Sequence, residues 1–576
     1  MCGFLAILKS DSAVSVGVHS SRAEQLLDQL AHRGPDGRGV WQGKHAWLGH
    51  RRLAIVDPEG GAQPCIRNGV AWVTNSEIYN HEELRKQTGA ADMPACDSAV
   101  FGSAWRKYGD DLPKHLDGQF AFVIVDEARG VWMAARDPIG ICPLYVGRHA
   151  DGSLWFASEM KALVADCEHV EIVPPGHAWI GDERGVRCEK WYTPRWQQDG
   201  YVPETPVDPE ALRQTLIDAV IKRLMGDVPS GLLLSGGLDS SLIASIAVRH
   251  AKQSKSRTGF GEHFHTFSIG LPGSPDLIAA RKTAKFLGTI HHEFHFTVEE
   301  ALAEVPSVMR HLESWEQIRT AVPTKILARK VRESGFKMVL SGEGADELLG
   351  GYLYFHKAPG REEMQAELVR KVTRLHQFDV MRANKAPMAH GLEVRFPFLD
   401  RAFVDLVMEI DPREKMIDMR SCPDGIHPRM EKFVLRAAFD DSRQPWLPEA
   451  TLWRAKEQFS DGVGYDWVDR LRDHAAEIIT TDAWESRAER FPNATPSTHE
   501  QYWMRELFEE SFAGERACAE SARATVPRGR SIACSTPEAL TWDASWSTAA
   551  GDISGRAIAG VHPQASGFAI DAVPCS

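Results

Sequence analysis

The loop Ser235–Ser240, of sequence Ser-Gly-Gly-Leu-Asp-Ser, constrains the fold of this chain more than any other stretch. The apolar run Gly231–Leu234 before it predicts a short buried strand, and the apolar periodicity of Ser241–Val248 after it predicts the start of a helix. A Gly-Gly turn at a helix N-terminus exposes backbone N–H groups where the macrodipole favours negative charge, so the loop can hold a phosphate-like anion. A helix cap with a tight turn is the alternative interpretation.

This loop is not a Walker A loop, because no lysine follows it to reach the terminal phosphates. Asp239 at the start of the helix is useful only if a cation accompanies the anion. The loop therefore favours a magnesium-bound pyrophosphate.

Strands and helices alternate around this loop. The proline-rich residues 194–209 are typical of a linker between domains. Beyond it the pattern predicts helices over 209–224, from 241 to about 250, and over 276–287, and strands over 231–234, 264–269 and 291–296. This alternation predicts an α/β doubly wound parallel sheet with ligands at the carboxyl ends of its strands.

A second loop repeats this logic. The apolar run Met338–Leu340 is followed by Ser341–Glu347, of sequence Ser-Gly-Glu-Gly-Ala-Asp-Glu. Its alternative interpretation is a turn before a solvated acidic helix start. The recurrence of such a loop in one alternating domain favours one shared ligand site over two purely structural turns.

Cys2 is the notable feature of the N-terminal third. A small second residue allows Met1 to be removed, which would leave Cys2 at the mature N-terminus. A free α-amino group titrates near ~8 and a thiol near ~8.5, so the amine can act as general base for its own thiol, directly or through a water. The alternative is a cysteine that packs as a small hydrophobic residue.

Short β-like runs follow, at residues 46–53, 70–74, 121–126, 131–136 and 154–157, with helical patterns at 23–30 and 97–108. They predict stacked antiparallel sheets with helices outside, in an α+β domain that spans residues 2–193.

Five spaced motifs in this domain resemble the class II glutamine amidotransferase domain, an N-terminal-nucleophile hydrolase. They are Cys2, Arg33–Gly37, His50–Leu53, Asn75–Asn80 and Arg136–Tyr145. The resemblance implies that Cys2 attacks the side-chain amide of glutamine, forms a glutamyl thioester and releases ammonia.

The resemblance also implies a glutamine site. A zwitterionic amino acid needs a cation for its α-carboxylate, which Arg52 supplies as a bidentate fork, and anions for its α-amino group, which Glu77 and Asp97 supply. The Asn75 amide and the Ser76 backbone N–H would form the oxyanion hole. The implied glutamine-binding set is Arg52, Leu53, Ala54, Ile55, Val56, Asn75, Ser76, Glu77 and Asp97.

Two positions depart from the family pattern. Ser76 replaces the usual glycine, which costs strain if the turn needs a positive φ. Ala99 replaces the acidic residue usual two positions after Asp97. Both concern the efficiency of the glutaminase.

The two acidic loops of the second domain, residues 210–513, resemble the ATP-pyrophosphatase domain of glutamine-hydrolysing asparagine synthetases. Supporting matches lie at residues 270–277, 382–385, 397–400 and 456–462. The implied reaction joins the aspartate β-carboxylate to the α-phosphorus of ATP, releases pyrophosphate and then displaces AMP with ammonia.

The resemblance implies these roles: Glu343 promotes the amination, Asp239 and Asp346 bind Mg²⁺, and Lys456 neutralises charge on the pyrophosphate. The implied ATP-binding set is Leu234, Ser235, Gly236, Gly237, Asp239, Ser240, Ile269, Ser341, Gly342 and Lys456.

Composition limits the partners. With 66 basic and 79 acidic residues the formal charge is −13, which disfavours nucleic acid and anionic membranes. Ten cysteines without a C-x-x-C pair and the lack of a long apolar run favour a reduced cytoplasm and no membrane span. A homodimer is the candidate assembly, with glutamine, aspartate and ATP as small-molecule partners.

Three further stretches carry expectations. Residues 514–576 predict a loosely ordered tail without function. His291, Glu293 and His295 share one face of a predicted strand, where a polar strand end is favoured over a metal site. Residues 313–319 are about two residues shorter than in relatives, so an aspartate pocket that includes them would differ locally.

Three functional hypotheses follow. The leading one is glutamine-dependent asparagine synthesis. The second keeps both half-reactions but amidates another carboxylate. The third is a bare glutaminase or a nucleotide-binding regulator, which intact Cys2, Asp239, Glu343 and Asp346 disfavour.

Overall fold

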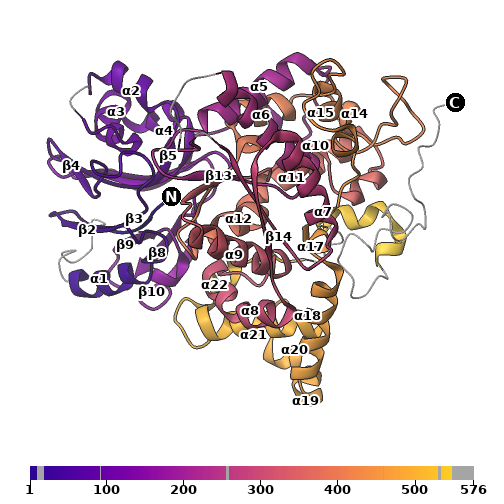
Figure 1. The fold of residues 1–576 in the computed structure, drawn as a ribbon. Helices are drawn as coiled ribbons and strands as arrows, with labels where there is room; N and C mark the ends of the chain where they lie inside the picture. The colour runs from indigo at the N-terminus through magenta and orange to yellow at the C-terminus, as the bar shows by residue number, and fades with distance from the viewer. Residues whose placement is uncertain are drawn as a thin grey trace.

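The computed structural model describes residues 1–9, 19–90, 93–253, 259–261, 263–457, 459–529 and 534–547. These residues form two halves that share an extensive contact (Figure 1). The chain's N-terminus lies at the junction between the halves, and the ammonium group of Met1 pairs there with Glu393 of the second half.

The N-terminal half contains two six-stranded sheets in which every pair of neighbouring strands is antiparallel, as predicted. The first has the order β10-β8-β9-β1-β3-β2 and the second β12-β11-β7-β6-β5-β4. The strands are β1 Gly3–Leu8, β2 Gly37–Gln42, β3 Ala46–Arg52, β4 Cys65–Arg67, β5 Val70–Ile78, β6 Gly118–Asp126, β7 Val131–Arg136, β8 Tyr145–His149, β9 Leu154–Ala157, β10 Cys167–Ile172, β11 His177–Asp182 and β12 Gly185–Lys190.

β1 is completely buried because it lies in the middle of its sheet, between β3 and β9. Its apolar residues pack in the core with the inward-facing residues of the second sheet, such as Ala71, Val73 and Val123. Cys2 is thereby held at the start of a rigid central strand. Outer helices cover the sheets, including α1 Ser20–Asp28, α2 His81–Thr88, α3 Phe101–Tyr108 and α4 Leu112–His115.

The C-terminal half is built on a five-stranded sheet of order β15-β14-β13-β16-β17, in which all neighbouring strands are parallel. The alternation of strands and helices thus predicted the sheet correctly. Its strands are β13 Ser230–Leu233, β14 His265–Gly270, β15 Ile290–His295, β16 Met338–Leu340 and β17 Glu393–Arg395.

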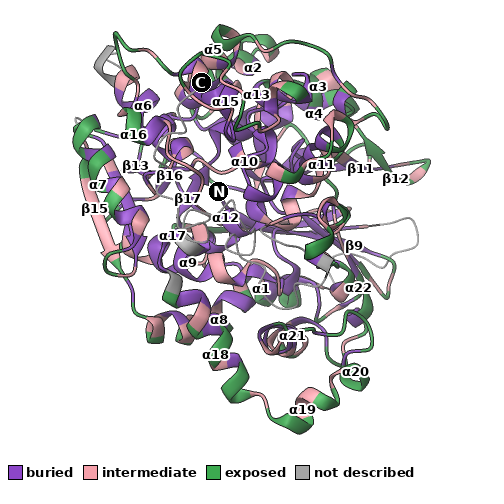
Figure 2. Ribbon diagram, turned by 90° about the vertical axis from the view of Figure 1, so that its right-hand side faces the viewer, coloured by how far each residue is buried: buried purple, intermediate pink, exposed green. Residues whose placement is uncertain are grey.

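Helices surround this sheet. They are α5 Pro209–Lys222, α6 Leu238–Gln253, α7 Pro275–Leu287, α8 Val298–Leu312, α9 Ile318–Glu333, α10 Ala345–Leu349, α11 Arg361–Arg374, α12 Asp379–Met388, α13 Arg401–Met408, α14 Pro412–Lys415, α15 Phe433–Ala438, α16 Glu449–Leu452, α17 Phe459–Gly462, α18 Tyr465–Ile478, α19 Thr481–Glu485, α20 Arg487–Arg490, α21 His499–Phe512 and α22 Ala519–Ala524. All ten residues of α12 are buried, whereas α19 is exposed at the periphery (Figure 2).

The predicted tail needs correction in its first part. Within residues 514–529 and 534–547 the chain forms α22 and short 3-10 helices, and Cys518, Ala522, Val526 and Ala539 are buried. Apolar contacts with the body of the protein therefore order this part of the tail. Residues 548–576 lie outside the described residues.

No helix among the described residues combines the length and apolar composition needed to cross a bilayer.

Candidate active sites

Cys2 lies buried at the start of β1. Its backbone N–H donates to Oδ1 of Asn75 over 2.8 Å, and its Sγ is 3.4 Å from the backbone nitrogen of Leu53. Burial raises the pKa of the thiol, and the adjacent N-terminal ammonium offsets this in part. The predicted nucleophile, the predicted oxyanion-hole amide and one residue of the predicted glutamine site are therefore in direct contact.

Asn75 and Ser76 lie within β5, opposite Ala121 and Phe120 of β6. The sequence predicted a strand ending at Thr74, but β5 continues to Ile78 because β6 pairs with it throughout. Ser76 has no positive φ, so the strain considered for this substitution does not arise. The Asn75 Nδ2 atom is buried and has no hydrogen-bond partner among the described residues, which leaves this donor available to an oxyanion.

Met1 occupies a buried space beside Cys2. Its ammonium pairs with Glu393 and lies 4.0 Å from Glu77, and its Sδ accepts from Nδ2 of Asn384 over 2.9 Å. Although burial opposes ionisation, Met1 and Arg395 hold the pKa of Glu393 at about 2. Removal of Met1 would leave the new α-amine of Cys2 beside these acids.

The other predicted glutamine-binding residues have partners of their own. Arg52 donates to the carbonyls of Asp57 and Pro58, at 2.7 and 2.6 Å. Asp97 accepts from the backbone N–H of Ile78 over 2.9 Å. Glu77 is paired with Arg395, and burial, with Glu393 nearby, raises the pKa of Glu77. The stretch Leu53–Ile55 is buried, whereas Val56 is partly exposed.

The second site forms where two loops meet at the carboxyl ends of β13 and β16. Gly236 has a φ of +76°, and a Cβ there would lie 2.4 Å from the backbone nitrogen of Ala280, so the tight turn requires glycine. A Cβ on Gly342 would lie 2.6 Å from the backbone nitrogen of Ser240. The two loops singled out in the sequence are thus packed against each other.

Two lysines hold the acids of these loops. Lys432 donates to Asp239 and lies 2.7 Å from Oδ1 of Asp346, while Lys456 donates to Oδ2 of Asp346 over 2.6 Å. Burial alone would raise the pKa of Asp346, but the two lysines outweigh it and hold this pKa well below its usual range. The arrangement places two lysines and two carboxylates together at the predicted pyrophosphate site.

Glu343 lies in the same loop as Asp346. Arg382 of α12 donates to its Oε1 over 2.7 Å. Burial raises the pKa of Glu343, and Arg382 counteracts this rise. An acid with a raised pKa and an adjacent fixed cation is suited to proton transfer.

These side chains line a cavity of about 980 Å³. All the predicted ATP-binding residues except Gly236 contribute to its wall, as do Glu343 and Asp346. A cavity of this volume accommodates a nucleotide and a small amino acid together.

The C-terminal part of the chain also lines this cavity. Residues 534–538, the C-terminal strap, are attached to one face of α11: Thr536 Oγ1 donates to Glu367 over 2.6 Å, Lys371 donates to the carbonyl of Cys534 over 3.0 Å, and Arg374 pairs with Glu538. Sequence reasoning missed this wall because the segment carries no recognisable motif.

Several residues that the structure brings to the two sites were given no role from the sequence. Lys432 precedes the short helix α15 and resembles any surface lysine, although its φ of +59° marks a fixed conformation. The only available signal for Arg382 and Asn384 was the matched stretch 382–385. Glu393 and Arg395 lie on β17, a strand of three residues that is too short to be recognised from its hydrophobic periodicity.

Residues of the 313–319 loop contact both halves of the protein. The Glu313 carboxylate accepts from the backbone N–H groups of Met160 and Lys161, at 2.8 and 2.7 Å, and pairs with Lys385. Residues 315–319 line the cavity instead. The first residue of the loop therefore joins the two halves.

Comparison with known proteins agrees with this geometry. The profile of the glutamine amidotransferase domain matches residues 1–191, and that of asparagine synthase matches residues 211–362 and 357–530. The chain belongs to the asparagine synthase family. The antiparallel N-terminal-nucleophile fold of the first half and the parallel-sheet synthetase fold of the second, both predicted from the sequence, are confirmed.

Full-length relatives in this family are similar over nearly the whole chain. A glutamine-hydrolysing asparagine synthetase of Asparagus officinalis is 48% identical over 98% of this chain and 94% of its own length. The corresponding enzyme 3 of Arabidopsis thaliana is 48% identical over 98% of this chain and 96% of its own length. That of Brassica oleracea is 47% identical, with 98% and 94% coverage.

Proposed function

We propose that this chain is an ATP-dependent ligase that makes asparagine from aspartate with glutamine as nitrogen donor. Family membership supports the overall reaction. The observation that carries the division of labour is that buried helix α12 contacts both sites: Asn384 reaches Met1, and Arg382 reaches Glu343. Ammonia made in the first half would be consumed in the second.

In the glutaminase half, once Met1 is removed, the free α-amine of Cys2 takes the proton of the thiol, and the resulting thiolate attacks the amide carbon of the glutamine side chain. The Asn75 Nδ2–H and the Ser76 backbone N–H donate to the oxyanion. The C–N bond then breaks, and a proton delivered by the α-amine leaves with the nitrogen as ammonia. Water hydrolyses the thioester to glutamate and restores the thiol. The free Nδ2 donor of Asn75 supports this assignment.

Recognition of glutamine is assigned to the ring of residues around Cys2. Arg52 pairs with the α-carboxylate, and Glu77 and Asp97 accept from the α-ammonium group. Leu53, Ala54, Ile55 and Val56 form one wall. The position of Leu53 against Cys2 Sγ supports this placement.

In the synthetase half, the aspartate β-carboxylate attacks the α-phosphorus of ATP, and the bond to the β-phosphate breaks to release pyrophosphate. The loops that contain Ser235–Ser240 and Ser341–Gly342 hold ATP, with Leu234 and Ile269 beside it. Lys456 and Lys432 neutralise the leaving pyrophosphate. Their contacts with Asp239 and Asp346 support this role.

Mg²⁺ is assigned to Asp239 and Asp346. Both are carboxylates from adjacent loops, and Oδ1 of Asp239 is buried without a hydrogen-bond partner among the described residues. Oxygen donors of this kind fit Mg²⁺. When bound, the ion would neutralise charge on the phosphates.

Glu343 acts in the last step. Ammonia attacks the acyl carbon of β-aspartyl-AMP, Glu343 takes a proton from the incoming nitrogen, and the bond to AMP breaks. Arg382 keeps the Glu343 carboxylate oriented and favours its ionised form.

Another carboxylate as acceptor is the second candidate, because the cavity wall includes the C-terminal strap and residues 315–319, part of the 313–319 loop for which the sequence predicts a locally different aspartate pocket. The deciding experiment incubates the protein with ATP, Mg²⁺ and glutamine across a panel of carboxylic acids. We expect aspartate-dependent release of pyrophosphate and formation of asparagine. If pyrophosphate release requires another acid, that acid is the substrate in place of aspartate. If no acid in the panel leads to pyrophosphate release, the synthetase function is rejected.

The homodimer and the cytoplasmic compartment stay predictions from the sequence. Light scattering on the purified chain tests the first, and fractionation of cells tests the second.

A further inference from the structure

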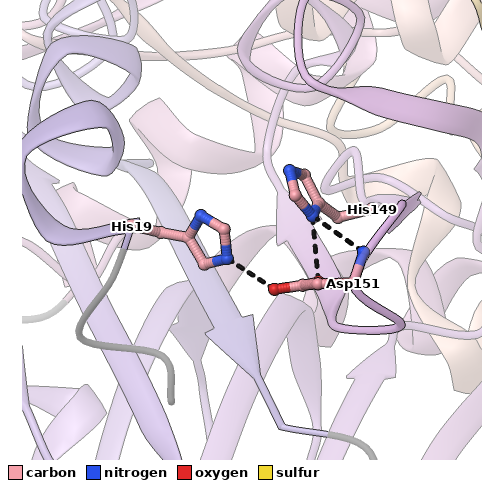
Figure 3. Close-up of side chains that lie close together, drawn as sticks. All are labelled: His19, His149 and Asp151. Carbon is pink, nitrogen blue, oxygen red and sulfur yellow. Dashed lines mark hydrogen bonds and ion pairs between the residues drawn. The ribbon is translucent and has the colours of Figure 1, made fainter. Parts of the chain in front are cut away.

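A three-residue cluster of potential metal ligands lies in the N-terminal half, among residues that the proposed reaction does not use. His19 immediately precedes α1, His149 ends β8, and Asp151 lies in the turn between β8 and β9 (Figure 3). His19 Nε2 is 2.7 Å from Asp151 Oδ2, and His149 Nδ1 is 2.9 Å from Asp151 Oδ1. Two segments about 130 positions apart in the sequence therefore meet at one carboxylate.

The arrangement has the composition of a transition-metal site. One donor atom from each of the three residues lies within 4.8 Å of the others. A tetrahedral zinc ion at about 2.1 Å from each ligand holds its ligands about 3.4 Å apart, so small side-chain rotations would complete such a geometry. Two imidazoles and one carboxylate are a donor set suited to zinc and related divalent ions.

Neighbouring side chains hold the ligands in place. Ser153 donates to Asp151 Oδ1 through its backbone N–H, over 2.9 Å, and through its hydroxyl, over 2.6 Å. The Ser153 hydroxyl in turn accepts from Trp155 Nε1 over 2.9 Å. The ring of His149 stacks on Trp155, and the ring of His19 packs edge-on against the same indole. Outer contacts of this kind orient metal ligands in proteins.

Exposure fits a site that an ion can reach. The side chains of His19, His149 and Asp151 are 13%, 22% and 14% exposed. The ligands are thus mostly shielded but keep one side open to water, which would take the fourth coordination position.

We propose that His19, His149 and Asp151 bind a divalent transition-metal ion of the zinc class, which joins the start of α1 to the β8–β9 turn. The site is separate from the Asp239 and Asp346 pair and has a structural role in the glutaminase half. The histidines at β15 offer no equal alternative: Glu293 pairs with Arg281, and His291 is engaged by Thr266 and Ser268. Among the described residues, His19, His149 and Asp151 form the single cluster with three converging donors.

The test is isothermal titration of the full chain with ZnCl₂, in a Cys2→Ala background that removes the reactive thiol as a competing ligand. We expect one site, weakened by more than about 10-fold in His19→Ala, His149→Ala or Asp151→Asn, because even the loss of an outer contact to a ligand typically costs about 10- to 100-fold. His169→Ala is the matched control, because His169 lies on neighbouring β10 with a half-exposed side chain. Co²⁺ should give the visible absorption of a tetrahedral complex, and this absorption should disappear in the same three variants.

Three outcomes would overturn the proposal. The first is that the chain takes up no Zn²⁺, and the second is that uptake survives in all three variants. The third is that uptake disappears only in His265→Ala/His292→Ala, which would place the ion at β14 and β15. Ammonia-dependent synthesis by the second half and circular dichroism identify any variant that has simply unfolded.

Discussion

Arg382 donates from Nη2 to Oε1 of Glu343 over 2.7 Å, and both side chains line the synthetase cavity. Arg382 is 4% exposed and Glu343 26%. A buried cation therefore controls the protonation of the acid assigned to the amination step.

Arg382→Met should shift the pH dependence of ammonia-driven synthesis. Burial raises the pKa of Glu343 and Arg382 lowers it, so loss of the cation raises this pKa further. Because the base must be ionised, the acidic limb of the pH–rate profile moves to higher pH. Arg382→Lys keeps a positive charge and should shift the limb less. If the acidic limb of the pH–rate profile is unchanged in Arg382→Met, Glu343 does not take part in the proton transfer.

Cys2→Ala should abolish synthesis from glutamine and leave synthesis from ammonium within about twofold of the wild type. The nucleophile is lost, whereas the second cavity contains no atom of Cys2. Cys188→Ala, at an exposed cysteine on β12, is the control and should retain both activities. If Cys2→Ala also lost synthesis from ammonium, the proposed division between the halves would be wrong.

Lys432→Ala should slow aspartate-dependent release of pyrophosphate by about 100-fold, the usual cost of removing one group that stabilises developing charge. Lys432 contacts both Asp239 and Asp346, so their charges would also lose a partner. Glutamine hydrolysis should be unaffected. Lys285→Ala, exposed on α7, controls for loss of a lysine. Normal pyrophosphate release by a folded Lys432→Ala protein would contradict the assignment.

Glu347→Gln should flatten the dependence of stability on pH. Burial, with Asp379 nearby, raises the pKa of Glu347 to about 8 from its ordinary 4.5. Between these values the folded chain keeps a proton that the unfolded chain has lost, so stability falls as pH rises from 4.5 to 8. The neutral glutamine avoids this loss and still accepts from the Tyr352 hydroxyl.

We expect Glu347→Gln to gain about 4–5 kcal/mol relative to the wild type at pH 8.5, because the pKa rise from 4.5 to about 8 corresponds to about 1.4 kcal/mol per pK unit, with little change at pH 4.5. Thermal unfolding midpoints across this range measure the difference. Glu333→Gln, at an exposed position on α9, should follow the wild-type curve. A Glu347→Gln curve parallel to the wild type would show that Glu347 ionises normally.

Thr536→Val should loosen the C-terminal strap. The Thr536 hydroxyl donates to buried Glu367, and a hydrogen bond to a charged group contributes about 1.5–3 kcal/mol. We expect the KM for aspartate or ATP to rise about 3- to 10-fold while glutaminase activity stays constant. Thr541→Val, exposed nearby, is the matched control. Equal KM values in the two variants would mean that the strap does not shape the substrate site.

The sequence predicted the local parts of this protein well. The observed ends of three strands and the helices between them differ from the predicted ends by at most three residues. These elements are β13, α6, β14, α7 and β15. The strand–turn–helix loops at Ser235–Ser240 and Ser341–Glu347 are recognisable because glycines, small residues and apolar runs determine the conformation of the adjacent backbone. Long-range pairing leaves no such local signal, so β5 was predicted too short: its polar end, Asn75–Glu77, is stabilised by pairing with β6.

Tertiary structure alone decided which distant side chains complete the sites. Lys432 reaches Asp239 across 193 positions, Glu393 reaches Met1 across 392, and Thr536 reaches Glu367 across 169. Such contacts depend on how helices and strands pack, and a lone lysine, glutamate or threonine carries no local signal of its partner. Local sequence motifs therefore identified the two reactions, whereas long-range packing determined which side chains pair with the charged groups of the two sites.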